Sequence, residues 1–364
     1  MFYFSPCVLS TILRYNHMQI NKINKSSTNF TGMLNNKILL KGLEKISEHG
    51  TSFAAGTSLV MALGVRPLAI LSTPNTEKEN KQYASTNSIC SGLIKFGLVE
   101  AVALPVENAV KKIDQNPQKY LKQSTIKNLQ SSSKNLLDSK SYNLATQILK
   151  LGTGFLTAIP KSMLTIALLP ILMDKIFHIK KNDTQTTITK KPTSNQTQNT
   201  KQLSFNGKLT NLTAKGLGKI LDNTKFQNFV KRHKHEEKNI AKHISAATDI
   251  LLTSSFAYQT HKSKKIKDNR KKALIYNNVI STAITLTGGY SLDKLIKKQT
   301  DKFIDKFSQI NKADPKLAKY IEGINILRPT IIFAGIYYGI LPVFSTYISD
   351  KIDKHLEKKS SQTK

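Results

Sequence analysis

The sequence is poor in the residues that support disulfide and metal chemistry. Among its 364 residues there are only two cysteines, Cys7 and Cys90, and no tryptophan. That count excludes a disulfide framework and a metal site of the CxxC type within one chain, and it leaves room for at most one long-range bridge. Reduced thiols are typical of a cytoplasmic or membrane protein.

Acidic residues are also scarce. There are 23 of them against 55 basic residues, so the formal net charge is +32, and only five of the basic residues are arginines. A surface this basic attracts polyanions, which are either nucleic acid or the anionic headgroups of a membrane. No aromatic-rich basic strand or zinc finger accompanies the lysines. We therefore favour anionic membrane lipid as the partner, with nucleic acid as the possibility that rests on charge alone.

Catalytic signatures are missing. The sequence contains no GxxxxGK[ST], GxGxxG or GxSxG motif. Its one cluster of histidines, KRHKHEEKNIAKH at 231–243, places His233 and His235 two positions apart, so that they diverge on a helix. These observations predict that the protein is not an enzyme and has no metal site and no cofactor.

Alternating runs of β-branched residues between turns are scarce, which predicts an all-α protein. The main positive feature is an ordered series of internal matches. NFTGMLNNKILLKGLEKI (29–46) resembles SFNGKLTNLTAKGLGKI (204–220), and shorter pairs follow in the same order. The pairs are Pro117 and Lys119-Tyr120 with Pro315 and Lys319-Tyr320, and Leu169-Pro170 with Leu341-Pro342. Such a series indicates an internal duplication.

The duplication predicts the domain organisation. A first copy occupies 29–181, a second copy occupies 204–355, and the polar segment 182–203 is expected to be a flexible linker. An N-terminal extension (1–28) precedes the copies and a disordered tail (356–364) follows them. The apolar start MFYFSPCVLSTIL has no basic flank or cleavage site, so it is read as upstream of a true start at Met18, or else as a membrane tether.

Each copy is expected to open with a short basic amphipathic helix, at 36–47 and at 209–221. Apolar residues recur there at helical spacing between lysines: Leu39, Leu40, Leu43 and Ile46 in the first copy, and Leu209, Leu212, Leu217 and Ile220 in the second. A helix of this kind can lie on a membrane surface. The alternative is an ordinary helix that packs on the rest of the fold.

Three long apolar stretches follow in each copy, at 51–73, 88–110 and 151–173, and at 244–260, 273–292 and 329–349. About 20 apolar residues cross a bilayer, and 273–292 and 329–349 reach that length without a charge. The other four contain charged residues, so they face a protein interior or do not span. A soluble helical bundle is the competing interpretation.

Four charges within or beside these stretches are candidate functional residues. Arg66 and Glu100 are a possible intramembrane pair, and Asp249 and Arg328 are another. Arg328 would alternatively anchor the start of its helix at the headgroup level. Pro170 and Pro342 are candidate helix breaks in corresponding positions, a pattern that points to transport sites in some transporters but more often only shapes packing.

Topology depends on how many stretches span. Three spans in each copy would place the second copy upside down relative to the first, which is the inverted-repeat plan of many transporters. Two spans in each copy, with 88–110 and its counterpart in the interface, would make the copies parallel and the linker cytoplasmic. The charge of the loops does not decide between the two plans.

Three strings resemble predicted membrane proteins of gut bacteria for which no activity is established. They are EHGTSFAAGTSLVMALGVRPLAILSTPNTEKENKQYA (48–84), DNRKKALIYNNVISTA (268–283) and LRPTIIFAGIYYGILPV (327–343). The resemblance covers roughly residues 29–355. It implies a bacterial membrane protein and no particular chemistry.

Together these features predict an internally duplicated helical protein of the bacterial cytoplasmic membrane, with about three long apolar helices and one basic amphipathic helix per copy. The favoured function is a non-enzymatic, membrane-organising or scaffold-like role. A small-solute transporter built from inverted repeats is the first alternative. A soluble basic module that binds nucleic acid is the second.

Overall fold

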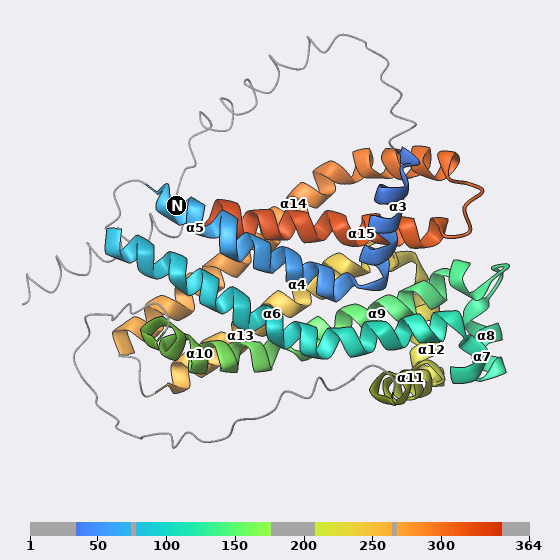
Figure 1. Ribbon diagram of the computed structural model, residues 1–364, viewed down its shortest axis with the longest axis horizontal. Helices are drawn as coiled ribbons and strands as arrows, with labels where there is room; N and C mark the ends of the chain where they lie inside the picture. The colour runs from blue at the N-terminus through green and yellow to red at the C-terminus, as the bar shows by residue number, and fades with distance from the viewer. Residues whose placement is uncertain (1–33, 74–77, 176–207, 264–267, 344–364) are drawn as a thin grey trace, which may run out of the picture.

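The computed structural model describes residues 34–73, 78–175, 208–263 and 268–343, and these ranges contain helices and no strands (Figure 1). The expected all-α class is therefore confirmed for the described part of the chain. The predicted linker 182–203, the extension 1–28 and the tail 356–364 lie outside it.

Within the described ranges the first half of the chain forms a series of helical elements. They are α3 (Lys37–Glu48), α4 (Gly50–Val60), the π-helix η2 (Met61–Val65), α5 (Arg66–Leu71), α6 (Lys78–Gln115), α7 (Pro117–Tyr120), α8 (Gln123–Gln130), the 3-10 turn η3 (Leu136–Asp138), α9 (Lys140–Leu156) and α10 (Ala158–Lys175). The second half forms α11 (Lys208–Leu221), α12 (Thr224–Arg232), the 3-10 turn η4 (Lys234–Glu236), α13 (Ile240–Lys262), α14 (Asp268–Ile310), α15 (Leu317–Ala334) and the π-helix η5 (Gly335–Ile340).

Each half makes three long passes along one axis of the molecule. In the first half these are α4 to α5, then α6, then α9 with α10; in the second half they are α13, α14, and α15 with η5 (Figure 1). The short helices α3, α7, α8, α11 and α12 gather at one end of this array. We call it the basic end, formed by residues 34–48, 106–149, 208–240 and 297–325.

The two predicted amphipathic helices are α3 and α11. Asn36 caps α3, because its side-chain oxygen accepts a hydrogen bond from the Ile38 amide at 2.8 Å. The apolar stripe of α3 is buried through Leu40 and Leu43 as expected. In α11 the stripe differs from the prediction: Leu217 is buried together with Ala214 and Leu221.

The compact cores lie at the basic end, and each joins the two halves. In one, Leu40 and Leu43 of α3 pack against Ile304, Phe307, Tyr320 and Ile324 of the second half. In the other, Ala214, Leu217 and Leu221 of α11 pack against Ala109, Val110 and Ile113 of α6. The short helix of each half therefore buries its apolar face on the long helices of the other half.

Glycine permits two of these contacts. A Cβ atom at Gly323 would overlap the carbonyl group of Leu43, and a Cβ atom at Gly218 would overlap the carbonyl oxygen of Tyr120. Helix α3 and the segment around α7 can approach the opposite half this closely only because a side chain is missing.

The two halves are parallel. Both α3 and α11 lie at the basic end, and both halves make their first pass away from it (Figure 1). The inverted arrangement expected for three spans in each copy is therefore not the one that the structure has.

Four helical segments in the described ranges are long and apolar enough to cross a membrane: Gly50–Leu71, Ala84–Gln115, Lys140–Leu168 and Leu317–Val343. The stretch 273–292, which reaches spanning length without a charge, is not among them. Its asparagines, Asn277 and Asn278, and its Ser, Thr and Gly residues dilute the apolar ones. Three stretches that carry charges qualify instead, because their charged residues are few.

Candidate functional site

Apolar side chains are exposed around the array beyond the basic end. They come from every long helix and include Val60, Leu63, Leu68, Leu93, Leu156, Ile159, Met163, Leu164, Leu168, Ile250, Val279, Ile280, Ile284, Ile331, Ile340 and Val343. We call this band the girdle. An exposed apolar surface that surrounds a protein marks a membrane or protein contact, since water disfavours it.

Lysines dominate the surface of the basic end. Those exposed there include Lys122, Lys127, Lys134, Lys140, Lys225, Lys234, Lys238, Lys298, Lys302, Lys306 and Lys312. Helices α6 and α14 connect the two regions. With 38 and 43 residues they are about 57 and 65 Å long, roughly twice the thickness of a bilayer core.

The outward faces of α3 and α11 combine both kinds of surface. Ile38 is 82% exposed beside Lys37 and Lys41, and Leu212 is 68% exposed on the side of α11 that carries Leu209 and Ile220. Both helices lie across the array rather than along it (Figure 1). An amphipathic helix that exposes leucine and isoleucine between lysines is suited to an anionic membrane surface.

Buried charges inside the array are mostly paired across helices. The clearest pair joins Lys150 of α9 to Glu322 of α15, with Nζ and Oε1 2.8 Å apart. Ser47 completes it, because its hydroxyl donates to the other Glu322 oxygen at 2.6 Å and its carbonyl accepts from Lys150 Nζ. A buried carboxylate and ammonium that are both hydrogen-bonded tie α3, α9 and α15 together.

Glu107 performs a similar role for α4. Its carboxylate is fully buried and accepts hydrogen bonds from the amides of Thr51 and Ser52, at 2.8 and 3.1 Å, and from the Ser52 hydroxyl at 2.6 Å. His49 Nδ1 lies 3.3 Å from the same group. A negative charge at the first turn of a helix satisfies its free amides and complements its dipole.

The predicted pairing of Asp249 with Arg328 is not formed. Arg328 Nε donates to Asp293 of α14 at 2.8 Å, and Lys242 Nζ donates to the other oxygen of that carboxylate at 2.7 Å. Asp249 lies two turns further along α13 than Lys242. The charges that act on it are Lys161 and Lys95.

Arg66 and Glu100 do not meet either. Glu100 lies level with Ser52 at the start of α4, whereas Arg66 begins α5, which is about 20 Å further along the same pass. Arg66 instead places its guanidinium over the Tyr337 ring, 5.2 Å from the centroid. Its Nε and one oxygen of Glu100 are buried without a hydrogen-bond partner.

The two prolines proposed as helix breaks lie within helical segments. Helix α10 includes Pro170 and continues to Lys175. Pro342 follows η5 after one residue, and helical conformation continues to Val343. The irregular turns are the π-helices η2 and η5, which lie against each other and precede Arg66-Pro67 and Leu341-Pro342.

No group of three or more potential metal ligands occurs in the described ranges, which include the histidine cluster. His235 and His243 both approach Glu236, at 3.4 and 3.7 Å. The neighbouring Glu237 points into the protein, and burial raises its pKa to about 7 against a hydrogen bond with Asn143.

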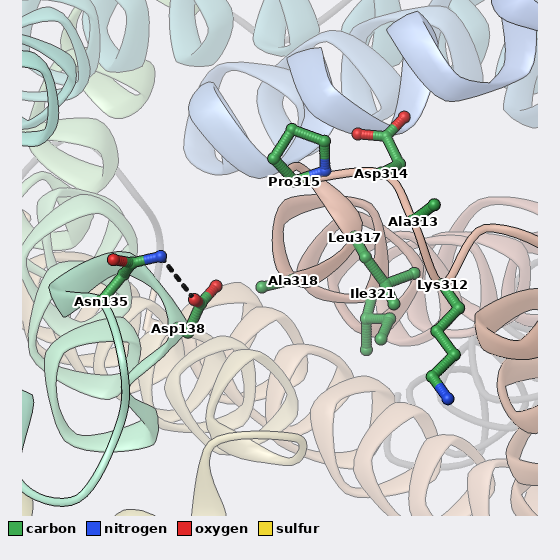
Figure 2. A pocket seen from close by; sticks show the side chains of 9 residues that line it. All are labelled: Asn135, Asp138, Lys312, Ala313, Asp314, Pro315, Leu317, Ala318 and Ile321. Carbon is green, nitrogen blue, oxygen red and sulfur yellow. Dashed lines mark hydrogen bonds between the residues drawn. The ribbon is translucent and has the colours of Figure 1, made fainter.

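A shallow pocket of about 400 Å³ lies at the basic end between η3 and the loop that joins α14 to α15 (Figure 2). Asn135 donates to Asp138 at 3.3 Å, and Asp314 already accepts hydrogen bonds from the Tyr320 hydroxyl and the Lys316 amide. The two carboxylates that line the pocket therefore already accept hydrogen bonds within the protein.

Several buried groups that organise the array were missed from sequence, namely Glu107, Lys150, Asp293 and Glu322. Each lies within a long helix, and its partner lies on another helix. No family model, no curated protein and no solved structure matches this chain.

Proposed function

We propose that this chain is a non-enzymatic membrane protein that sets its lysine-rich end against an anionic lipid surface and so organises that surface or what binds to it. One observation carries the proposal: every long helix exposes apolar side chains of the girdle beyond the basic end. Four helices that are long and apolar enough to cross a membrane are compatible with it.

The transverse helices α3 and α11 support the lipid assignment. Their exposed Ile38 and Leu212 would enter the headgroup boundary, while Lys41, Lys215 and Lys219 would contact lipid phosphates. A bacterial cytoplasmic membrane, with its anionic inner surface, is the location that we infer from the charge.

The parallel arrangement also bears on the transporter alternative. The same arrangement removes the inverted repeat that motivated a transporter, so we do not favour transport.

We also infer that the two halves arose by duplication. One support is the order of helices, because a short amphipathic helix is followed by three long passes in each half. The other is that α3 and α11 each pack on the long helices of the opposite half. Corresponding pairs such as Leu43 and Leu217, both buried in exchanged contacts, agree with the sequence matches.

Alkaline carbonate extraction tests membrane integration. We expect the full-length tagged protein to remain in the membrane pellet. Recovery in the supernatant would overturn the proposal, and steeply salt-dependent DNA binding by that soluble protein would then support the nucleic-acid alternative.

Reconstitution in nanodiscs tests the lipid surface. The unfolding temperature should be higher with anionic lipid than with neutral lipid, and the difference should shrink in the double variant Lys215→Glu with Lys219→Glu on α11. The double variant Lys127→Glu with Lys134→Glu, elsewhere on the basic end, separates α11 from the rest of that surface. A smaller loss in this variant would assign the main lipid contact to α11, and an equal loss would assign it to the whole basic end.

A further inference from the structure

We propose that Arg66, Lys95 and Lys161 form a binding site for one small oxyanion, of the carboxylate or phosphate type, inside the array. The site lies where the two π-helices meet. It goes beyond the lipid-facing role of the basic end, since it lies within the apolar half of the molecule.

The backbone at this level is irregular on two neighbouring passes. Helix η2 leads directly into Arg66, and η5 contains Tyr337 at its centre. The two turns are in contact, since a Cβ atom at Gly339 would lie 3.7 Å from Val65 Cγ1. Single π-turns inside helices frequently mark functional sites, because they redirect side chains that a regular helix would stagger.

Positive charge is concentrated around the Tyr337 side chain. The Arg66 guanidinium covers its ring, and Arg66 and Lys95 are the cations that act on its hydroxyl group. Lys161 of α10 is only 9% exposed and lies in the field of Lys95. Three cations from α5, α6 and α10 therefore converge on one region.

The carboxylates do not balance them. Asp249 of α13 is the acid that acts on Lys161, and within the described ranges none of the three cations forms an ion pair. Arg66 Nε is in addition a buried donor without an acceptor. An uncompensated buried charge and an unpaired buried donor are both costly, so this arrangement favours an added anion.

The other buried cations differ because each contacts a carboxylate directly. Lys150 is paired with Glu322, and Arg328 and Lys242 both contact Asp293. An oxyanion would give Arg66 Nε the acceptor that it lacks and would offset the two lysines. Arginine beside lysine suits oxygen anions, since guanidinium donors match their geometry.

Calorimetric titration of the purified full-length protein with inorganic phosphate, in neutral detergent, tests the site. We expect one saturable binding event, weakened about tenfold or more by Arg66→Gln or Lys161→Gln, as for the loss of a charge-assisted hydrogen bond. The control Lys127→Gln, on the surface of the basic end, should bind as the unmodified chain does. Lys95→Gln, at a half-buried position, serves if either of the first two variants fails to fold.

Two results would overturn the site: no saturable binding by the unmodified protein, or unchanged binding in Arg66→Gln and in the lysine variants. Nanodiscs separate the sources of the anion. If anionic lipid competes with phosphate, the natural ligand is a lipid headgroup; if it does not, the ligand is a free oxyanion. A variant that loses phosphate binding should still resist carbonate extraction, so failure of the site and failure of the membrane proposal are distinguishable.

Discussion

The Nζ atom of Lys150 lies 2.8 Å from Oε1 of Glu322, although 172 positions separate the two residues in the chain. Both side chains are almost completely buried. This pair connects the third pass of the first half to the third pass of the second half, and with Ser47 it also holds the end of α3. The association of the halves thus depends on a polar contact as well as on the apolar cores.

Removal of one partner of the Lys150–Glu322 pair should destabilise the protein strongly. Lys150→Ala or Glu322→Ala leaves an unpaired buried charge, and we expect each to lower the free energy of unfolding by about 3–5 kcal/mol. The double variant Lys150→Met with Glu322→Leu should recover most of that loss, because no charge is left without a partner. Thermal unfolding in neutral detergent measures both effects.

The exposed pair of Lys316 with Glu44, 2.7 Å apart, is the matched control. Lys316→Ala should change the free energy of unfolding by only about 0–1 kcal/mol, since the lysine is half exposed. Equal effects at Lys150 and Lys316 would show that the buried pair has no special role.

The glycines at the exchanged contacts should not tolerate a methyl group. Gly323→Ala and Gly218→Ala bring a Cβ atom into a backbone carbonyl of the opposite half, which a rigid helix cannot avoid. We expect each to lower the free energy of unfolding by about 1–3 kcal/mol.

Gly42 and Gly216 provide controls on the same short helices, because a Cβ atom there meets nothing within 4 Å. Gly42→Ala and Gly216→Ala should be neutral or should stabilise by up to about 1 kcal/mol through helix propensity. If all four substitutions behaved alike, the close approach of the halves would be wrong.

The titration of Glu237 should lower the free energy of unfolding as the pH rises from weakly acidic to neutral. Burial raises the pKa of this carboxyl group from an ordinary value of 4.5 to about 7, so the folded state holds the proton more tightly than the unfolded state does. The stabilisation is therefore complete below about pH 4.5 and is lost as the pH rises to about 7.

Glu237→Gln should remove this dependence. At pH 8 the variant should be more stable than the unmodified chain by about 1–2 kcal/mol, with no gain at pH 4.5. Glu236→Gln is the neighbouring control: a hydrogen bond from Asn239 and the adjacent histidines and Lys297 lower the pKa of Glu236, so its replacement should give no gain at pH 8. Unfolding temperatures across this range would decide, and a gain that did not vary with pH would contradict the assignment.

The parallel arrangement can be tested by labelling from one side of the membrane. Lys127 and Lys225 are exposed at the basic end, one in each half. Single cysteines at these positions, in a chain without Cys7 and Cys90, should react with an impermeant maleimide from the same side of sealed vesicles. Reaction from opposite sides would restore the inverted arrangement and contradict the packing of α3 and α11.

Local features were predictable because they depend on neighbouring residues. The short helices at 36–47 and 209–221 were placed within a residue or two of α3 and α11, since apolar spacing and lysine flanks define them. The burial of Leu40, Leu43 and Leu217 followed from the same periodicity, but the exposure of Leu212 did not, because periodicity alone does not say which part of a stripe finds a partner.

The predictions of the two charged pairs were wrong for a different reason. Arg66 and Glu100 belong to adjacent antiparallel passes, and their separation depends on register along the helices. Asp249 lies about two helical turns from the level of Arg328 along the array. Arg328 therefore pairs with Asp293, a residue that no sequence pattern indicated. Register is set by packing over the whole array and leaves no signal near the residues themselves.

The sequence by itself determined that this protein is helical, strongly basic, without catalytic motifs and supplied with long apolar segments, because composition and periodicity are properties of short stretches. The tertiary structure alone decided that the halves are parallel, that the short helix of each half packs on the other half, and that Arg66, Lys95 and Lys161 gather near a single acid, Asp249. These relations join residues on different helices that are far apart in the chain, and only the packing of complete helices brings such residues together.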